Sequence, residues 1–221
     1  MNDSNRRRVL AGTCTAALGV TLLFNVLWRA AAADGPQSHT TIALAGFLAV
    51  LHVGLIAGML VAVTQLVRRK ADRLGLFGAA LTLLGATVSA RIFVLIQLAM
   101  LSEAAPGAPR ASFMELLASA PLVFVSLIPI GLTYPLGLIT LGIALFVARP
   151  VSRWLAVGVA LGGVLFPIGR AINVIPALYA SDAVLGVTFA VLGWQLLTRR
   201  ALWEGTPVEV GGAWPDAVLQ Q

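Results

Sequence analysis

Two arginines in this 221-residue chain lie inside long apolar runs, where a charged side chain needs a partner. Arg170 shares a helical face with Asn173, three residues further on, and Arg91 lies in the apolar run of residues 74–101. A guanidinium stays charged when it is buried, and its planar fork binds a carboxylate or a phosphate through two hydrogen bonds. These residues are therefore candidates for binding an anionic or strongly polar group inside a membrane.

The remaining candidate ligand-binding residues are polar side chains in or beside the other apolar runs: Asn25, His52, Tyr134 and Asp182. We expect His52 near the middle of the membrane and Asp182 at the start of the last helix, at the outer boundary. Tyr134 immediately precedes Pro135 and lies five residues after Pro129, and the two prolines are expected to kink or locally unwind the fourth helix. Freed carbonyls at such a break need a polar cavity or a protein partner.

Three of these residues are expected to share one level. Counted from the basic ends of their helices, Asn25, Arg91 and Arg170 lie about 24–27 Å into a hydrocarbon core about 30 Å thick. This places all three in the outer leaflet.

The arginines and the histidine also have purely structural explanations. Arg91 and Arg170 can extend to the outer headgroups, or pair with Glu115 or Asp182, and so hold the helices in register. His52 can form a neutral hydrogen bond across helices. Apart from Asp182, expected at the outer boundary, no aspartate or glutamate falls inside an expected span, which argues against a transporter driven by protons through a buried acid.

Motifs for other chemistry are missing from the sequence. It contains no nucleophile motif, no phosphate-binding glycine loop and no metal-ligand spacing. A six-coordinate haem site usually needs two histidines within the membrane, and His39 lies in an outer loop. A retinal protein is unsupported, because Lys70 is the only lysine and lies in a cytoplasmic loop. We predict no catalytic residue, metal or cofactor, and favour a protein that is not an enzyme.

Composition indicates the elements that position these residues. The chain is 59% hydrophobic and 11% charged, against about a quarter charged for soluble domains. Its net charge of +6 comes from short basic clusters beside apolar runs rather than from a basic stripe, so nucleic acid is not an expected partner. The sequence predicts an all-α, polytopic bundle of transmembrane helices in contact with the lipid bilayer. The single cysteine, Cys14, excludes a disulfide within the chain.

Six spans are predicted between a cytoplasmic N-terminus of residues 1–8 and a flexible cytoplasmic tail of residues 201–221. The spans cover about residues 9–28, 41–67, 74–101, 121–148, 154–179 and 182–198. The first span also has features of a signal peptide, but its apolar run is too long for a signal core. The fifth span is expected to break at Pro167 and Pro176, and the second contains Gly54 and Gly58 at the spacing that lets helices approach closely.

The orientation follows from the positions of lysine and arginine, which favour cytoplasmic loops. Eleven of the fifteen such residues fall on one side of the six spans and two on the other, with Arg91 and Arg170 inside. Both termini are therefore predicted to be cytoplasmic.

One part of the chain resembles a known group of proteins. Tyr134-Pro135-Leu136-Gly137-Leu138, then Ala148 to Trp154 with its basic turn ending in Arg-Trp, and then Phe166-Pro167-Ile168-Gly169-Arg170 follow one another. This order is similar to that in uncharacterised bacterial multipass membrane proteins. The resemblance implies a bacterial inner (plasma) membrane protein and supplies no activity or site residue.

Three functions fit these observations. The first is the binding or passage of a small polar or amphiphilic ligand in an outward-facing pocket within the membrane. The second is a structural or accessory subunit of a membrane complex, with an oligomer or complex partner. The third is a membrane-embedded enzyme acting on a lipid or isoprenoid, against which the shortage of buried acids counts. We favour the first.

Overall fold

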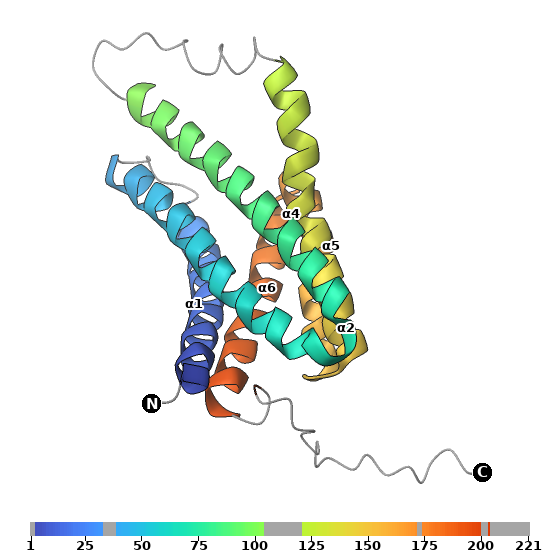
Figure 1. Ribbon diagram of the computed structural model, residues 1–221. Coiled ribbons are helices and arrows are strands. Elements are labelled where there is room, and N and C mark those ends of the chain that lie inside the picture. The colour runs from blue at the N-terminus through green and yellow to red at the C-terminus, as the bar shows by residue number, and fades with distance from the viewer. Residues whose placement is uncertain (1–2, 33–38, 104–120, 172–173, 200–202, 204–221) are drawn as a thin grey trace, which may run out of the picture.

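The computed structural model is all-helical in the residues it describes, which are 3–32, 39–103, 121–171, 174–199 and 203 (Figure 1). Its elements are α1 (Asp3–Ala32), α2 (His39–Glu103), α4 (Pro121–Ala148), α5 (Arg153–Ala171) and α6 (Ile175–Thr198). Four stretches are long and apolar enough to cross a membrane: Asp3–Trp28, Gly46–Ala90, Gly131–Ala148 and Ile175–Thr198. Arg153–Gly169 is a shorter apolar helix. The prediction of an all-α protein with several membrane-span-like helices is confirmed.

Helix α2 consists of two arms that meet at a sharp bend, visible in Figure 1. Only Ala71 leaves the helical conformation, with φ −140° and ψ 37°. The bend is tight because Gly75 packs against the side chain of Val67, where a Cβ atom would not fit. The loop expected between the second and third spans is therefore a single residue. We call residues 68–73 the α2 elbow.

The helices pack in antiparallel pairs whose backbones touch. A Cβ atom on Gly19 of α1 would overlap the backbone of Ala190 in α6, and one on Gly193 would overlap Ala16. In lipid there is no hydrophobic driving force between helices, so such close approach, which maximises van der Waals contact, is the main source of association. The α1–α6 pair is therefore built on small residues spaced along both helices.

The same packing joins the other neighbours. Backbone contacts link Gly85 of α2 with Tyr134 of α4, Gly142 of α4 with Ala160 of α5, and Gly169 of α5 with Leu178 of α6. The order of neighbours in the bundle is thus the second arm of α2, then α4, α5, α6 and α1.

The predicted glycine pair on the second span is half right. Gly58 lies against the Cys14 side chain of α1, so a Cβ atom there would overlap the sulfur. Gly54 is exposed, and no atom of the described residues lies within 4 Å of the position of its Cβ. Close approach is confirmed for Gly58 and wrong for Gly54.

Prolines also act differently from expectation. Helix α4 is continuous through Pro129 and Pro135, so it is not unwound there. The break expected at Pro167 is wrong, because α5 continues through this proline to Ala171. Pro176, the other expected break, occupies the first turn of α6. A proline is well tolerated in a first turn because its missing N–H would have no helical acceptor anyway. The helix boundary expected between residues 179 and 182 therefore lies earlier, between the end of α5 at Ala171 and the start of α6 at Ile175.

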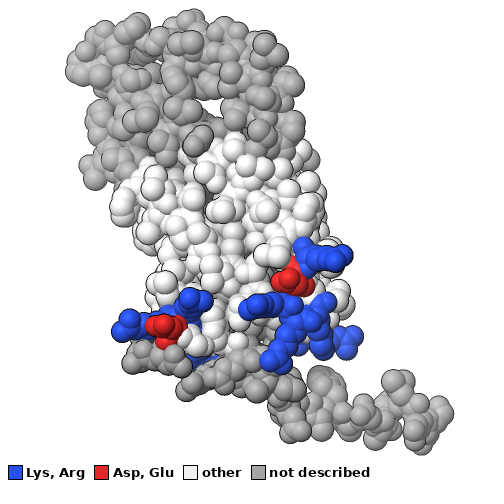
Figure 2. Space-filling view, viewed as in Figure 1, with Lys and Arg blue, Asp and Glu red and all other residues white. Residues whose placement is uncertain are grey.

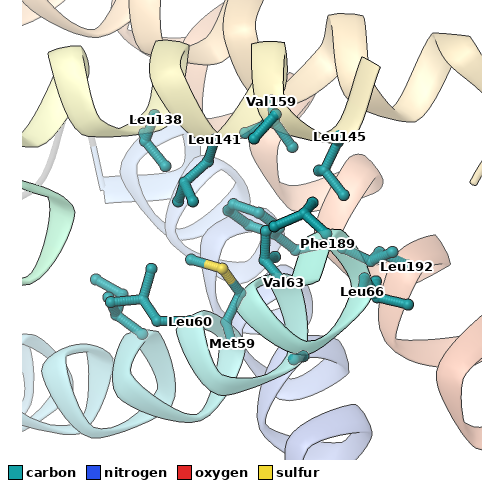
Figure 3. Close-up of a cluster of buried hydrophobic side chains, with 14 of the residues drawn as sticks. Met59, Leu60, Val63, Leu66, Leu138, Leu141, Leu145, Val159, Phe189 and Leu192 are labelled. Carbon is teal, nitrogen blue, oxygen red and sulfur yellow. The ribbon is translucent and has the colours of Figure 1, made fainter. Parts of the chain in front are cut away.

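Buried side chains from α2, α4, α5 and α6 meet in the centre of the bundle, as Figure 3 shows. They include Met59, Val63, Leu141, Val159 and Phe189, with Phe189 fully buried. Of residues 200–221 the structure describes only Trp203, which is buried in the same cluster. The rest of the predicted flexible tail lies outside the described residues.

Arg8 closes the C-terminal end of α6. Its guanidinium donates hydrogen bonds to the carbonyl oxygens of Leu196 at 3.1 Å and Leu197 at 2.9 Å. The Oδ1 atom of Asn5 accepts from the same guanidinium at 2.9 Å. The last carbonyls of a helix have no partner within the helix and bear partial negative charge, so a cation here stabilises the α1–α6 pair.

The close α1–α6 contact is testable with Gly19→Ala. We expect the midpoint of thermal unfolding in detergent, followed by tryptophan fluorescence, to fall by several degrees, because overpacking costs about 1–3 kcal/mol. Gly54→Ala is the matched control, since alanine favours a helix by about 1 kcal/mol and meets no described neighbour. Equal midpoints for the two variants would contradict the backbone contact.

The role of Arg8 is testable by comparing Arg8→Gln with Arg7→Gln, which removes the same charge from an exposed neighbour. Hydrogen bonds from a charged donor are worth about 1.5–3 kcal/mol. We therefore expect Arg8→Gln to lower the unfolding midpoint by a few degrees and Arg7→Gln to leave it unchanged. If both variants unfold with the wild type, the capping contact contributes nothing.

Candidate functional site

Asp182 lies well inside α6, and the prediction that it starts the last helix is wrong. It is the eighth residue of Ile175–Thr198, and only 2% of its surface is exposed. Phe189 is seven residues further on, so both lie on the same, central face of α6. A membrane-span-like helix therefore contains a buried carboxylate. The argument against proton-driven transport that rested on the absence of such an acid no longer applies.

Two further buried residues of α6 carry hydroxyls, one next to Asp182 and one six residues beyond it, and neither was singled out from the sequence. Ser181 is fully buried and donates a hydrogen bond to the carbonyl oxygen of Gly162 in α5 at 3.1 Å. Thr188, 2% exposed, packs against Gly158 in the same helix. The signal that could have found them is the pair of glycines four residues apart on α5, Gly158 and Gly162, which leaves room for side chains of the neighbouring helix.

Tyr134 joins three elements in the interior. Its side chain is buried, and its ring centroid lies 4.8 Å from that of Phe166 in α5, with the ring planes inclined by 57°. Its backbone touches Gly85 of α2. Such a tilted aromatic pair is a favourable arrangement and fixes the tyrosine ring. Tyr134 therefore contributes a phenol to the interior of the bundle, and its part in a ligand site stays a prediction.

Asn25 and His52 are half-buried and continue the inward faces of their helices. Asn25 follows the buried Leu18 by seven residues on α1. His52 precedes the buried Met59 by seven residues on α2, and its Nε2 atom is inaccessible to solvent. Seven residues are almost two helical turns, so each polar residue shares a face with its buried neighbour. Both side chains thus lie toward the bundle.

Contacts between the helices show which of these residues share a level. Leu23 lies against Gly186, which places Asn25 opposite Val184, about 3 Å along the axis from Asp182. Leu178 lies against Gly169, which places Phe166 opposite Ser181. Asn25, Asp182 and the Phe166–Tyr134 pair therefore occupy neighbouring levels of the bundle.

His52 and Arg170 lie at different levels of the bundle from Asn25. Cys14 lies against Gly58, which places His52 opposite Val20, about 7 Å nearer the basic end than Asn25. The backbone of Arg170 lies opposite Ala177, about 10 Å further from the basic end than Asn25. The expected common layer of Asn25 and Arg170 is therefore wrong, because counting along single helices ignored how far each helix is shifted.

The remaining predicted site residues are only partly described. Arg91 and Arg170 are helical residues of α2 and α5, with side chains outside the described part, and Asn173 lies outside the described residues altogether. Their part in a ligand site stays a prediction.

The described residues offer a carboxylate, hydroxyls, a phenol, an imidazole and an amide in the interior of the bundle, with the imidazole of His52 nearer the basic end than the carboxylate and the amide. They include no group of three His, Cys, Asp or Glu side chains arranged to hold a metal ion. What they can do is donate and accept hydrogen bonds to a polar group between the helices. Comparison of the chain with family models, curated proteins and solved structures finds no match.

Proposed function

We propose that the chain is a bacterial inner-membrane protein that binds or passes a small polar or amphiphilic ligand. The ligand would lie among the helices in the half of the bundle away from the basic end. The observation that supports this best is the burial of Asp182 inside α6.

A six-span topology with both termini in the cytoplasm is part of this proposal. The bend at Ala71 divides α2 into two arms, which with α1, α4, α5 and α6 make six helical segments. The Lys and Arg side chains that the structure describes gather at one end of the molecule, as Figure 2 shows. Basic residues favour the cytoplasmic side, so this end is assigned to the cytoplasm.

The case for a ligand rests on the cost of charge within a membrane. An ionisable residue in a transmembrane helix is expensive and usually serves an ion or substrate path. Asp182 lies level with Asn25, and the backbone of Arg170 is about 8 Å further outward. Between them, a carboxylate, an amide and a guanidinium can bind a ligand with groups of both charges or several hydroxyls.

Two alternatives keep specific support. If Asp182 only ties helices together, the chain is a structural or accessory subunit, and its exposed apolar faces meet lipid or a partner. An enzyme acting on a lipid or isoprenoid regains some support from Asp182, because the objection drawn from missing buried acids is removed. The hydroxyl next to that acid, on Ser181, already donates a hydrogen bond to the Gly162 carbonyl oxygen.

Topology is testable by labelling single cysteines in a Cys14→Ser background. We expect Ser38→Cys and Ser112→Cys to react with a membrane-impermeant maleimide in intact cells, because both fall in predicted outer loops. Ser152→Cys, between α4 and α5, should react only after permeabilisation. The opposite pattern would overturn the orientation, and labelling of all three in intact cells would overturn the six-span count.

Ligand binding is testable with Asp182→Asn and Arg170→Leu. We expect a small molecule to co-purify with the full-length protein, detectable by mass spectrometry after denaturation. Each variant should retain at most about one tenth of the wild-type amount of this molecule, since a charge-assisted hydrogen bond is worth about 1.5–3 kcal/mol. Asp72→Asn, at the exposed α2 elbow, is the control and should retain the wild-type amount. Folded variants with wild-type retention, or a wild type that retains nothing, would favour the accessory-subunit alternative.

A further inference from the structure

Six cationic side chains from two distant parts of the sequence converge at the basic end of the bundle. The proposed ligand site lies toward the other end. Four belong to the α2 elbow, one follows the end of α4 and one is the first residue of α5, so that the last two bracket the α4–α5 connection. We call them the elbow cluster: Arg68, Arg69, Lys70, Arg73, Arg149 and Arg153.

The packing of α2 against α4 brings the two parts together. Leu141 lies against Gly78 and Tyr134 against Gly85, so the antiparallel register places Arg149 opposite Lys70. Ala71 and Ala148, which adjoin these residues, are buried in one hydrophobic cluster. In Figure 2 the larger group of basic side chains lies where Figure 1 places the α2 elbow and the α4–α5 connection.

The cluster has a large excess of positive charge. All six cations are exposed, and Asp72 is the only acid in the two connections, which leaves a net charge of +5 from six cations and one carboxylate. Like charges held this close repel one another, and an anion bound between them relieves the repulsion. Orientation in the membrane alone would not require the two connections to meet.

Arg149 is held in this cluster at a conformational cost. Its φ angle is +54°, in the left-handed region that favours glycine, and its N–H donates to the Leu145 carbonyl oxygen at 2.9 Å. Glycine would end α4 here with less strain. An arginine at this position adds a cation where the backbone would prefer no side chain.

Exposed aromatic rings lie on the membrane side of these cations. Phe77, Phe146 and Trp154 are 60%, 42% and 52% exposed, and the Arg153 guanidinium lies 6.0 Å from the centre of the Phe146 ring. Aromatic rings favour the interface between headgroups and acyl chains. A free anion would contact only the cations, whereas a lipid would contact both the cations and the rings.

We propose that the elbow cluster binds an anionic phospholipid of the cytoplasmic leaflet. The phosphate accepts hydrogen bonds from guanidinium groups of both connections, and the acyl chains lie along the exposed aromatic side chains. This site is independent of the proposed ligand site, since it shares no residue with it.

The test is a titration of the full-length protein in detergent with phosphatidylglycerol, with bound lipid counted by native mass spectrometry. Each basic residue near a membrane surface contributes roughly fivefold to lipid affinity. Arg68→Gln/Arg153→Gln should therefore lower the affinity about thirtyfold. The control Arg6→Gln/Arg7→Gln removes two exposed cations from α1 at the same end and should change it less than about threefold.

Arg149→Gly separates lipid binding from folding. It removes a cation from the cluster and relieves the left-handed backbone, so we expect about fivefold weaker binding with an unchanged or higher unfolding midpoint. The proposal is overturned if both double variants lose equal affinity, or if phosphatidylcholine binds as tightly as phosphatidylglycerol. It is also overturned if glycerol phosphate, which has no acyl chains, competes at equal concentration, because the site would then be one for free anions.

Discussion

Contact between helix backbones is the constraint on which the rest of this structure depends. Gly19, Gly85, Gly142 and Gly169 each face a neighbouring helix at a distance that excludes a Cβ atom. In a membrane, apolar side chains gain nothing by leaving lipid for protein, so helices are held by van der Waals contact and by the few hydrogen bonds between them. A small residue at each crossing brings the backbones close and fixes how far one helix is shifted against the next.

That fixed register determines where polar side chains meet. Asp182, Asn25 and Tyr134 come from three different helices, and each continues a face whose neighbours are buried. The hydrogen bond from Ser181 to the Gly162 carbonyl exists because glycine leaves the α5 backbone open at that level. The residues that hold the bundle together and those that form the polar interior are therefore interleaved along the same helices, so a change in packing also moves the site.

Charged side chains of the described residues are unevenly distributed along the bundle. The described basic side chains lie at one end, Arg8 neutralises the carbonyls at the end of α6, and the elbow cluster joins two connections through the α2–α4 contact (Figure 2). The apolar exterior between the two ends includes many exposed leucine, valine and aromatic side chains, as expected for a lipid-facing surface. The proposed ligand and lipid sites lie at opposite ends and depend on different physical effects, buried polarity in one and surface charge in the other.

The sequence by itself determined the class of protein, because apolar runs and basic clusters are local properties that survive any arrangement of the helices. It also singled out Tyr134, Asn25 and His52 as polar residues within apolar runs and Gly58 as a close contact. Only the tertiary structure decided that Pro176 lies in the first turn of a helix, since a proline suits both a helix break and a first turn. The contact between Gly169 and Leu178 shows that the chain has already turned back between these two residues, which selects the first turn. That boundary moved Asp182 from a helix end into the buried interior. The levels of Asn25 and Arg170 likewise depend on how neighbouring helices are shifted, which no count along a single helix contains.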